Sequence, residues 1–344
     1  MSDIDALKQA ATCETIHYDS ADGKTSIHAL VWMPGTVSGA PALAGDDAAD
    51  NNAAGQPTVC GIVQIVHGMV EHIERYDDFA RFLCAHGFAV CANDHIGHGG
   101  SVESDDQLGV LPKNGGDIMV RDVHALRTIM GQRLGDDVPY LMFGHSMGSF
   151  ILRAYLPRFG EGLAAAVVCG TGQQPVAVSK MGNLVARFLC ATHGEAYRSS
   201  FMHGLADGAY SKKVENPRTD LDWINTDPAK VDEYIADPAC GGVFSAGGYV
   251  SLTDLTATVA SKECAAGVPD GLPVLFISGA LDPVGDNGEG PKAAACAMQQ
   301  NSKANVSLKI YDGMRHEVLN EPGHAQVYDD VLEFFEQAIG KGGR

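Results

Sequence analysis

Hydrophobic and polar positions follow two different periods along this chain. Near the N-terminus, residues 14–18 and 26–32 are β-like runs and predict two strands. From residue 59 onward, short apolar runs typical of buried strands alternate with longer, helix-like segments. The predicted strands are 59–66, 89–92, 138–143, 164–169, 274–278 and 306–311, and the predicted helices are 76–85, 116–133, 150–156, 249–259, 290–300 and 325–339. This alternation predicts an α/β fold with a mostly parallel central sheet and helices on both faces.

The alternation is interrupted twice. Residues 34–57 are rich in Ala, Gly, Asp and Asn, and we expect a flexible surface excursion there, since the strand pattern resumes directly afterwards. A longer break runs from about residue 171 to 246. The simplest organisation is one α/β domain made of residues 1–172 and 246–344, with an inserted helical cap at 173–245.

The charge and the cysteines narrow the class of protein. A net charge of −19 argues against binding to nucleic acid and against electrostatic docking on anionic lipid. The nine cysteines are scattered without a C-x-x-C pair, so we expect free thiols in a reducing compartment. The N-terminal segment lacks the features of a signal peptide, and no window has the apolar length of a membrane span. These features predict a soluble cytoplasmic protein.

A serine between two glycines is the strongest candidate for chemistry. The sequence GHSMG at 144–148 joins a predicted strand to a helix-like segment, and such a sharp turn needs small residues at both glycine positions. The turn would expose the hydroxyl of Ser146 as a nucleophile. The backbone N–H of Met147, at the start of the helix, would point toward a developing oxyanion.

The loop after strand 59–66 is expected to supply the second oxyanion donor. Residues 67–69 are His-Gly-Met, and loops at the carboxyl ends of strands carry function in open α/β sheets. We expect the donor to be the backbone N–H of Met69. The alternative is that His-Gly simply ends the strand.

Two further residues complete a catalytic triad in the chain order that this turn requires, Ser, then acid, then His. Asp282 and His316 each follow a predicted strand. The carboxylate of Asp282 would orient the imidazole of His316, which would take the proton of Ser146 and return it to the leaving group. Asp286 is the alternative acid, and Asp282 could instead only open a turn before Pro283.

The histidine pair at residues 95 and 98 does not predict a metal site. His95 and His98 form an H-x-x-H pattern, but no third ligand follows at a defined spacing. We expect neither a metal ion nor a cofactor.

Taken together, these motifs resemble the monoacylglycerol lipase and lysophospholipase branch of the α/β-hydrolases, which is grouped with serine aminopeptidase-like hydrolases. The likeness covers most of residues 59–335. It implies the α/β-hydrolase fold, the triad Ser146, Asp282 and His316, and oxyanion donors at Met69 and Met147. The matching segments are HGMVEH at 67–72, DHIGH at 94–98, GHSMG at 144–148, DPAC at 237–240, DPVG at 282–285 and RHE at 315–317.

The cap is expected to shape the substrate pocket. Apolar residues between 181 and 189 recur at helical spacing and predict an amphipathic helix. Its apolar face either packs over the core, lines an acyl pocket or touches a lipid interface. Only Lys180 and Arg187 are basic nearby, so we expect weak interfacial contact at most. The candidate pocket residues, with ordinary packing as the alternative, are Leu184, Phe188, Phe201, Trp223 and Phe244.

The leading hypothesis is a serine carboxylic-ester hydrolase that acts on a small single-chain acyl ester, such as a monoacylglycerol or lysophospholipid, through an acyl-enzyme. An aminopeptidase-like amide hydrolase or a cofactor-free perhydrolase would use the same triad. A non-catalytic binding protein is disfavoured, because all three triad residues are present. The peptidase hypothesis stays open because acidic residues of the predicted cap could bind a free amino terminus. These residues are Glu195, Asp207, Glu215, Asp232 and Glu233.

Overall fold

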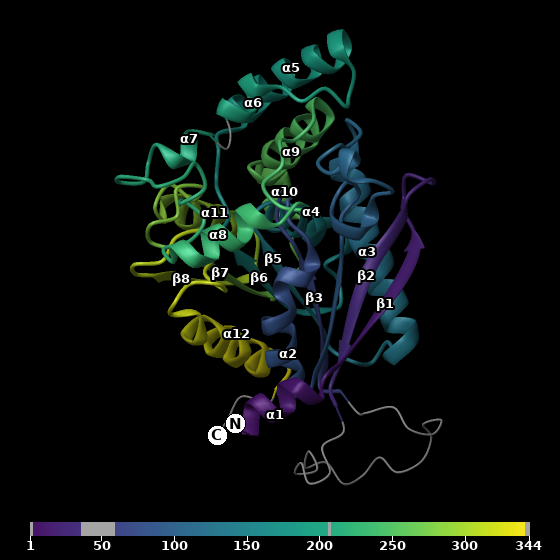
Figure 1. The fold of residues 1–344 in the computed structure, drawn as a ribbon. Coiled ribbons are helices and arrows are strands. Elements are labelled where there is room, and N and C mark those ends of the chain that lie inside the picture. Colours follow the sequence, from purple (N-terminus) through teal and green to yellow (C-terminus); the bar gives the residue numbers. More distant parts are fainter. Residues whose placement is uncertain (1–2, 36–58, 206–207, 341–344) are drawn as a thin grey trace, which may run out of the picture.

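The computed structural model describes residues 3–35, 59–205 and 208–340, and these form an eight-stranded sheet between helices (Figure 1). The strand order is β1-β2-β4-β3-β5-β6-β7-β8. The pairs β1–β2 and β2–β4 are antiparallel, and the remaining neighbours are parallel, so the predicted mostly parallel sheet is confirmed. The strands are β1 Thr12–Asp19, β2 Ser26–Met33, β3 Gly61–Val66, β4 Phe88–Asn93, β5 Tyr140–His145, β6 Leu163–Cys169, β7 Pro273–Gly279 and β8 Asn305–Tyr311.

The helices follow the predicted order, with additions. The predicted helices are present as α2 Asp77–Ala85, α3 Gly115–Leu134, α4 Met147–Phe159, α9 Ala246–Val259, α11 Glu289–Asn301 and α12 His324–Ala338. The amphipathic helix of the predicted cap is α5 Val176–His193. The pattern did not predict α1 Asp3–Ala10, α6 Ser200–Leu205, α7 Gly208–Ser211, α8 Pro228–Ala236 or α10 Lys262–Ala266. Short 3-10 turns lie at Ile73–Tyr76, Gly99–Ser101 and Asp105–Gln107.

Successive residues of the buried strands face opposite layers. In β3, Ile62 joins the apolar core beneath α3 and α4, whereas Val63 joins the core beneath α2 and α12. This period of two explains why both faces of the central strands are apolar. The result is two helical layers with the sheet between them (Figure 1).

The N-terminal hairpin is attached to α3 through a buried carboxylate. Asp122 accepts hydrogen bonds from the Ser20 hydroxyl at 2.8 Å and the Ala21 N–H at 2.6 Å. The hydroxyl of Tyr18 donates to the Asp122 backbone carbonyl at 2.9 Å. Burial raises the pKa of the Asp122 side chain to about 6.

Helices α5 to α8 lie between β6 and α9, in the stretch predicted as a cap. Trp223, Ile224, Val231, Tyr234 and Cys240 form a small apolar cluster of their own there. The division into two domains remains a prediction. The predicted excursion at 34–57 falls, apart from its first two residues, outside the described residues.

The apolar stripe of α5 is divided between two environments. Val185 and Leu189 pack against the main core, where α5 contacts α9. Met181, Leu184 and Phe188 are instead 64–65% exposed, on a helix at the top of the molecule in Figure 1. The stripe therefore only partly covers the core. Among the described residues, no helix is long and apolar enough to cross a membrane.

Candidate active site

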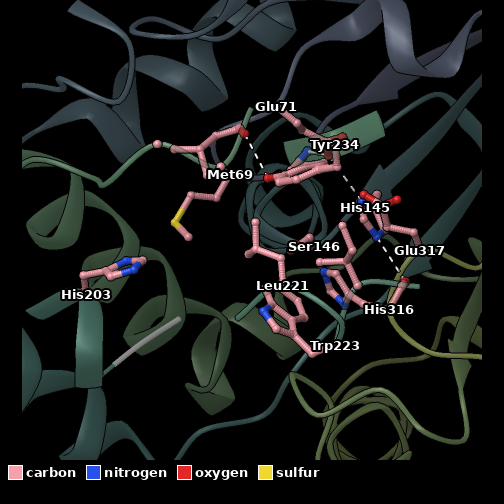
Figure 2. A pocket seen from close by; sticks show the side chains of 15 residues that line it. Met69, Glu71, His145, Ser146, His203, Leu221, Trp223, Tyr234, His316 and Glu317 are labelled. Carbon is pink, nitrogen blue, oxygen red and sulfur yellow. Dashed lines mark hydrogen bonds and ion pairs between the residues drawn. The ribbon is translucent and has the colours of Figure 1, made fainter. Parts of the chain in front are cut away.

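Four strands deliver the candidate residues to one edge of the sheet. Strand β3 leads into Met69, β5 into Ser146, β7 toward Asp282 and β8 toward His316. Parallel strands place their carboxyl ends at the same edge, where open α/β sheets bind ligands. Ser146, His316 and Met69 line one pocket together (Figure 2).

Ser146 occupies the sharp turn between β5 and α4. Its backbone has φ 54° and ψ −120°, a conformation that L-residues rarely adopt. A Cβ on Gly148 would lie 2.0 Å from the Val66 carbonyl oxygen, and one on Gly144 would lie 2.5 Å from the Gly148 carbonyl oxygen. The predicted need for small residues at both positions is confirmed.

His316 and Asp282 are in direct contact. The Nδ1 atom of His316 lies 3.0 Å from Oδ2 of Asp282, and the Val284 N–H donates to Oδ1 at 2.9 Å. Both side chains are buried. Burial alone would raise the pKa of Asp282, but the adjacent imidazole and these hydrogen bonds hold it below 3.8. The alternative acid, Asp286, instead forms an ion pair with Lys213.

The loop that carries Met69 is held in place by hydrogen bonds that involve the charged side chain of Glu71 and the neutral ring of His67. A Cβ on Gly68 would lie 3.1 Å from Cβ of Ser146, so this loop runs directly beside the serine. The Gly68 N–H donates to Glu71 at 2.6 Å. Burial and the neighbouring His98 lower the pKa of His67 to about 3, and its neutral Nε2 accepts from the His95 N–H at 2.9 Å.

A buried ion network, which the sequence analysis did not identify, supports both loops. Arg75 donates to Glu71 at 2.7 Å and to both carboxylate oxygens of Glu317 at 2.6 and 2.9 Å. Tyr76 donates to Glu71 at 2.8 Å. Although burial opposes ionisation, hydrogen bonding to His145 and the charge of Arg75 hold the pKa of Glu71 well below 4.5. Glu71 lies in the matching segment at 67–72 and Arg75 follows four residues later, which was the available signal.

Comparisons with known proteins show the family of this chain. The family model for serine aminopeptidase, S33, matches residues 57–323. This chain belongs to that family. Within the family, it is 31% identical over 290 residues to a monoacylglycerol lipase of Mycolicibacterium smegmatis, a match that covers 80% of this chain and 87% of that protein. It is 29% identical over 288 residues to the mouse monoglyceride lipase, covering 77% and 81% of the two chains.

Solved structures of similar proteins share the fold. A thermostable carboxyl esterase from Bacillus coagulans, solved in complex with glycerol, superposes with a TM-score of 0.83 at 30% identity and covers 95% of this chain and 99% of its own. A lipase in its open form gives a TM-score of 0.78 at 27% identity, covering 95% and 99%. The α/β-hydrolase fold expected from the resemblance is confirmed.

The pocket of this S33 family member is a hollow of about 490 Å³, counting the space at its open mouth. Of the five predicted pocket residues, Trp223 lines it, with its ring centre 5.1 Å from that of His316. Leu184, Phe188 and Phe201 lie exposed on α5 and α6, and Phe244 is fully buried, all outside the pocket lining. Lining residues that the sequence analysis did not single out include His203, Leu221, Ile224, Tyr234 and Gly241.

Proposed function

We propose that this chain is a serine ester hydrolase that cleaves single-chain acyl esters such as monoacylglycerols or lysophospholipids. The observation that carries the proposal is the position of Ser146, which is held in a positive-φ turn within the same pocket as His316. The ring of His316 is in turn hydrogen-bonded to the buried carboxylate of Asp282. Relatives named monoacylglycerol lipase and a neighbour named carboxyl esterase support the ester substrate.

In the proposed mechanism, His316 takes the proton of the Ser146 hydroxyl as the oxygen attacks the acyl carbon. The backbone N–H groups of Met69 and Met147 stabilise the oxyanion, at roughly 3 kcal/mol for one donor. His316 then protonates the departing alcohol and leaves an acyl-enzyme. A water molecule, activated by the same imidazole, releases the fatty acid.

The charges around the pocket favour an ester over a peptide with a free amino terminus. The carboxylates of Glu71 and Glu317 line the pocket, but both are already paired with Arg75. None of the described acidic cap residues considered for a peptidase lines it, and Asp207 lies outside the described residues. An ammonium group would therefore meet no unpaired carboxylate among the described lining residues.

The pocket also offers a donor for an oxygen-rich head group. The indole Nε1 of Trp223 is buried and has no hydrogen-bond partner among the described residues. Buried polar groups are normally satisfied, so an unpaired donor in a pocket wall suits a substrate oxygen. Trp223 would thus serve a hydroxyl of a glycerol head group.

We further propose that lipid aggregates contact the enzyme through α5 and α6. Exposed apolar side chains gather on these helices: Val178, Met181, Leu184, Phe188, Phe201 and Leu205. Arg187 is already paired with Asp254, so the contact would be apolar rather than electrostatic. A cytoplasmic location, also proposed, fits the nine cysteines, all described and all free thiols.

Hydrolysis rates across glycerol monoesters of increasing acyl length test the function. A lysophospholipid and an aminoacyl amide are measured alongside, and Ser146→Ala provides the blank. We expect turnover of medium or long monoesters and none in the variant. Activity only on the amide would overturn the substrate, and full activity of Ser146→Ala would overturn the mechanism.

A further inference from the structure

A second group of reactive side chains lies beside the pocket and takes no part in the proposed mechanism. It consists of His72, Asp237 and Cys240, and one ligand atom from each lies within 4.8 Å of the others. Nε2 of His72 is 2.8 Å from Oδ2 of Asp237. Imidazole nitrogen, carboxylate oxygen and cysteine sulfur are three different side chains that bind metals, gathered at one point.

The fold holds these three residues in place from two distant segments. His72 precedes the 3-10 turn after β3, whereas Asp237 caps the end of α8 and Cys240 follows in the next turn. Oδ1 of Asp237 accepts from the Ala239 N–H at 2.9 Å, which leaves Oδ2 facing His72. The Cys240 N–H donates to the Asp237 carbonyl at 3.0 Å. The cluster is therefore organised before any ion binds.

We propose that His72, Asp237 and Cys240 form a binding site for Zn²⁺. Zinc accepts nitrogen, oxygen and sulfur ligands in a tetrahedron, at about 2.0–2.3 Å, and open sites use three protein ligands and one water. On binding, the ion replaces the hydrogen bond between His72 and Asp237. The Cys240 thiol releases its proton to solvent, and the thiolate forms the zinc–sulfur bond.

Charges of both signs surround the cluster. Arg75 is paired with Glu71 and Glu317, so the charge of the ion would be balanced by its own ligands, the Asp237 carboxylate and the Cys240 thiolate. The side chains of His72 and Asp237 are 13% and 32% exposed, which gives the ion a path from solvent.

Zinc at this position would fix one wall of the pocket. The Gly241 N–H and the Tyr234 hydroxyl both donate to the Val70 carbonyl, at 2.9 and 3.0 Å. Val70, Tyr234 and Gly241 all line the pocket. The ion would join the segment after α8 to the loop that carries Met69, a second link beside these hydrogen bonds.

The test measures metal binding directly, with the full-length protein stripped by a chelator. Zn²⁺ is titrated against a chromophoric competitor, and Co²⁺ serves as a spectroscopic substitute. We expect a saturable site of one ion per chain and a thiolate-to-cobalt charge-transfer band. Cys240→Ser and Asp237→Asn should each weaken zinc binding at least about tenfold, since loss of even an outer-shell partner costs that much.

The matched control is Cys190→Ser, which alters a half-buried thiol on α5, outside the cluster. It should bind zinc as the wild type does and keep the cobalt band. Circular dichroism establishes that each variant is folded. The proposal is overturned if the wild type binds no zinc, or if folded Cys240→Ser and Asp237→Asn bind zinc and show the cobalt band unchanged.

Discussion

Asp282 combines complete burial with a retained negative charge. A buried carboxylate without partners would take up a proton, but this one is bonded to the His316 ring and to the Val284 N–H. The charge can therefore fix the ring so that Nδ1 carries the proton and Nε2 is free to act on Ser146. Orientation of the imidazole, rather than proton transfer to the acid, is the role that we assign to Asp282.

Replacing Asp282 by asparagine tests that role. The amide can favour the wrong tautomer of His316, so we expect kcat on a soluble ester to fall by about 10³- to 10⁴-fold. Steady-state kinetics measure the change. Asp286→Asn is the matched control, because Asp286 pairs with Lys213, and it should retain near wild-type kcat. If kcat fell in Asp286→Asn and was retained in Asp282→Asn, Asp286 rather than Asp282 would be the acid of the triad.

Asp122 should make stability depend on pH in an unusual direction. Its pKa is about 6 in the folded chain against 3.8 ordinarily, so its stabilising contribution is present at low pH and is lost as the pH rises through 6. The shift corresponds to about 3 kcal/mol. The variant Asp122→Asn lacks this titrating group. All other groups contribute equally to the pH dependence of both proteins, so their contributions cancel when the free energies of unfolding are compared.

Denaturant unfolding of both proteins between about pH 4 and pH 7 measures this effect. The free energy of unfolding of the wild type, relative to Asp122→Asn, should decrease as the pH rises. A difference that stays constant over this interval would show that Asp122 titrates normally.

At the scale of elements, the strands were the most predictable feature. Continuous apolar runs mark strands that are buried on both faces, and all eight predicted strands are present. Helices α1 and α10 were missed because eight and five residues carry little periodic signal. The period of α5 predicted a helix, but it could not tell that Leu189 packs while Leu184 is exposed.

The candidate site was most predictable where backbone geometry or the order of residues along the chain restricts the sequence, as for Ser146, Asp282 and His316. Close approach at Gly144 and Gly148 allows no side chain, and this requirement is visible in the motif. The pocket wall was not predictable, because Leu221, Ile224 and Tyr234 reach it through packing of distant segments. Their local sequence has no feature that distinguishes them from ordinary core residues.

The exposed face of α5 gives a prediction about substrate aggregates. Leu184 and Phe188 are 65% and 64% exposed, so the double change Leu184→Ser/Phe188→Ser should leave folding intact. We expect unchanged kcat/KM on a soluble short ester. On monoester presented in neutral vesicles, the rate should fall about tenfold or more, because two buried apolar contacts with lipid are lost.

Leu308→Ser, which alters an exposed leucine on β8, is the control for surface hydrophobicity. It should hydrolyse both forms of substrate like the wild type. Equal rates on vesicles for the double variant and the wild type would refute the proposed contact through α5.

At the scale of the whole molecule, the loop of His316 is attached to the stretch between β6 and α9. The Arg315 guanidinium donates to the carbonyls of Asp222 and Asn225 at 2.5 and 2.9 Å. Glu321 accepts from the N–H groups of Arg315 and Thr226, at 2.8 and 3.0 Å. These bonds flank Trp223 and hold it over the pocket.

Arg315→Ala should loosen that wall without removing a triad residue. We expect KM for a long-chain monoester to rise severalfold while kcat on a short ester changes little. The free energy of unfolding should fall by about 1–3 kcal/mol, because two carbonyls lose a charged donor. Arg133→Ala, which breaks only a surface ion pair with Glu14, should change neither quantity appreciably. An unchanged KM in Arg315→Ala would argue against this positioning.

The order of the strands and helices has a consequence for how this enzyme can evolve. Ser146, Asp282 and His316 follow β5, β7 and β8, whereas Leu221, Trp223 and Tyr234 come from the stretch between β6 and α9. Part of the pocket wall is therefore encoded apart from the proposed triad, although Met69 and Val70 of the loop after β3 also line the pocket. We expect mutation or recombination within codons 176–236 to alter which esters are accepted while the proposed triad is inherited intact.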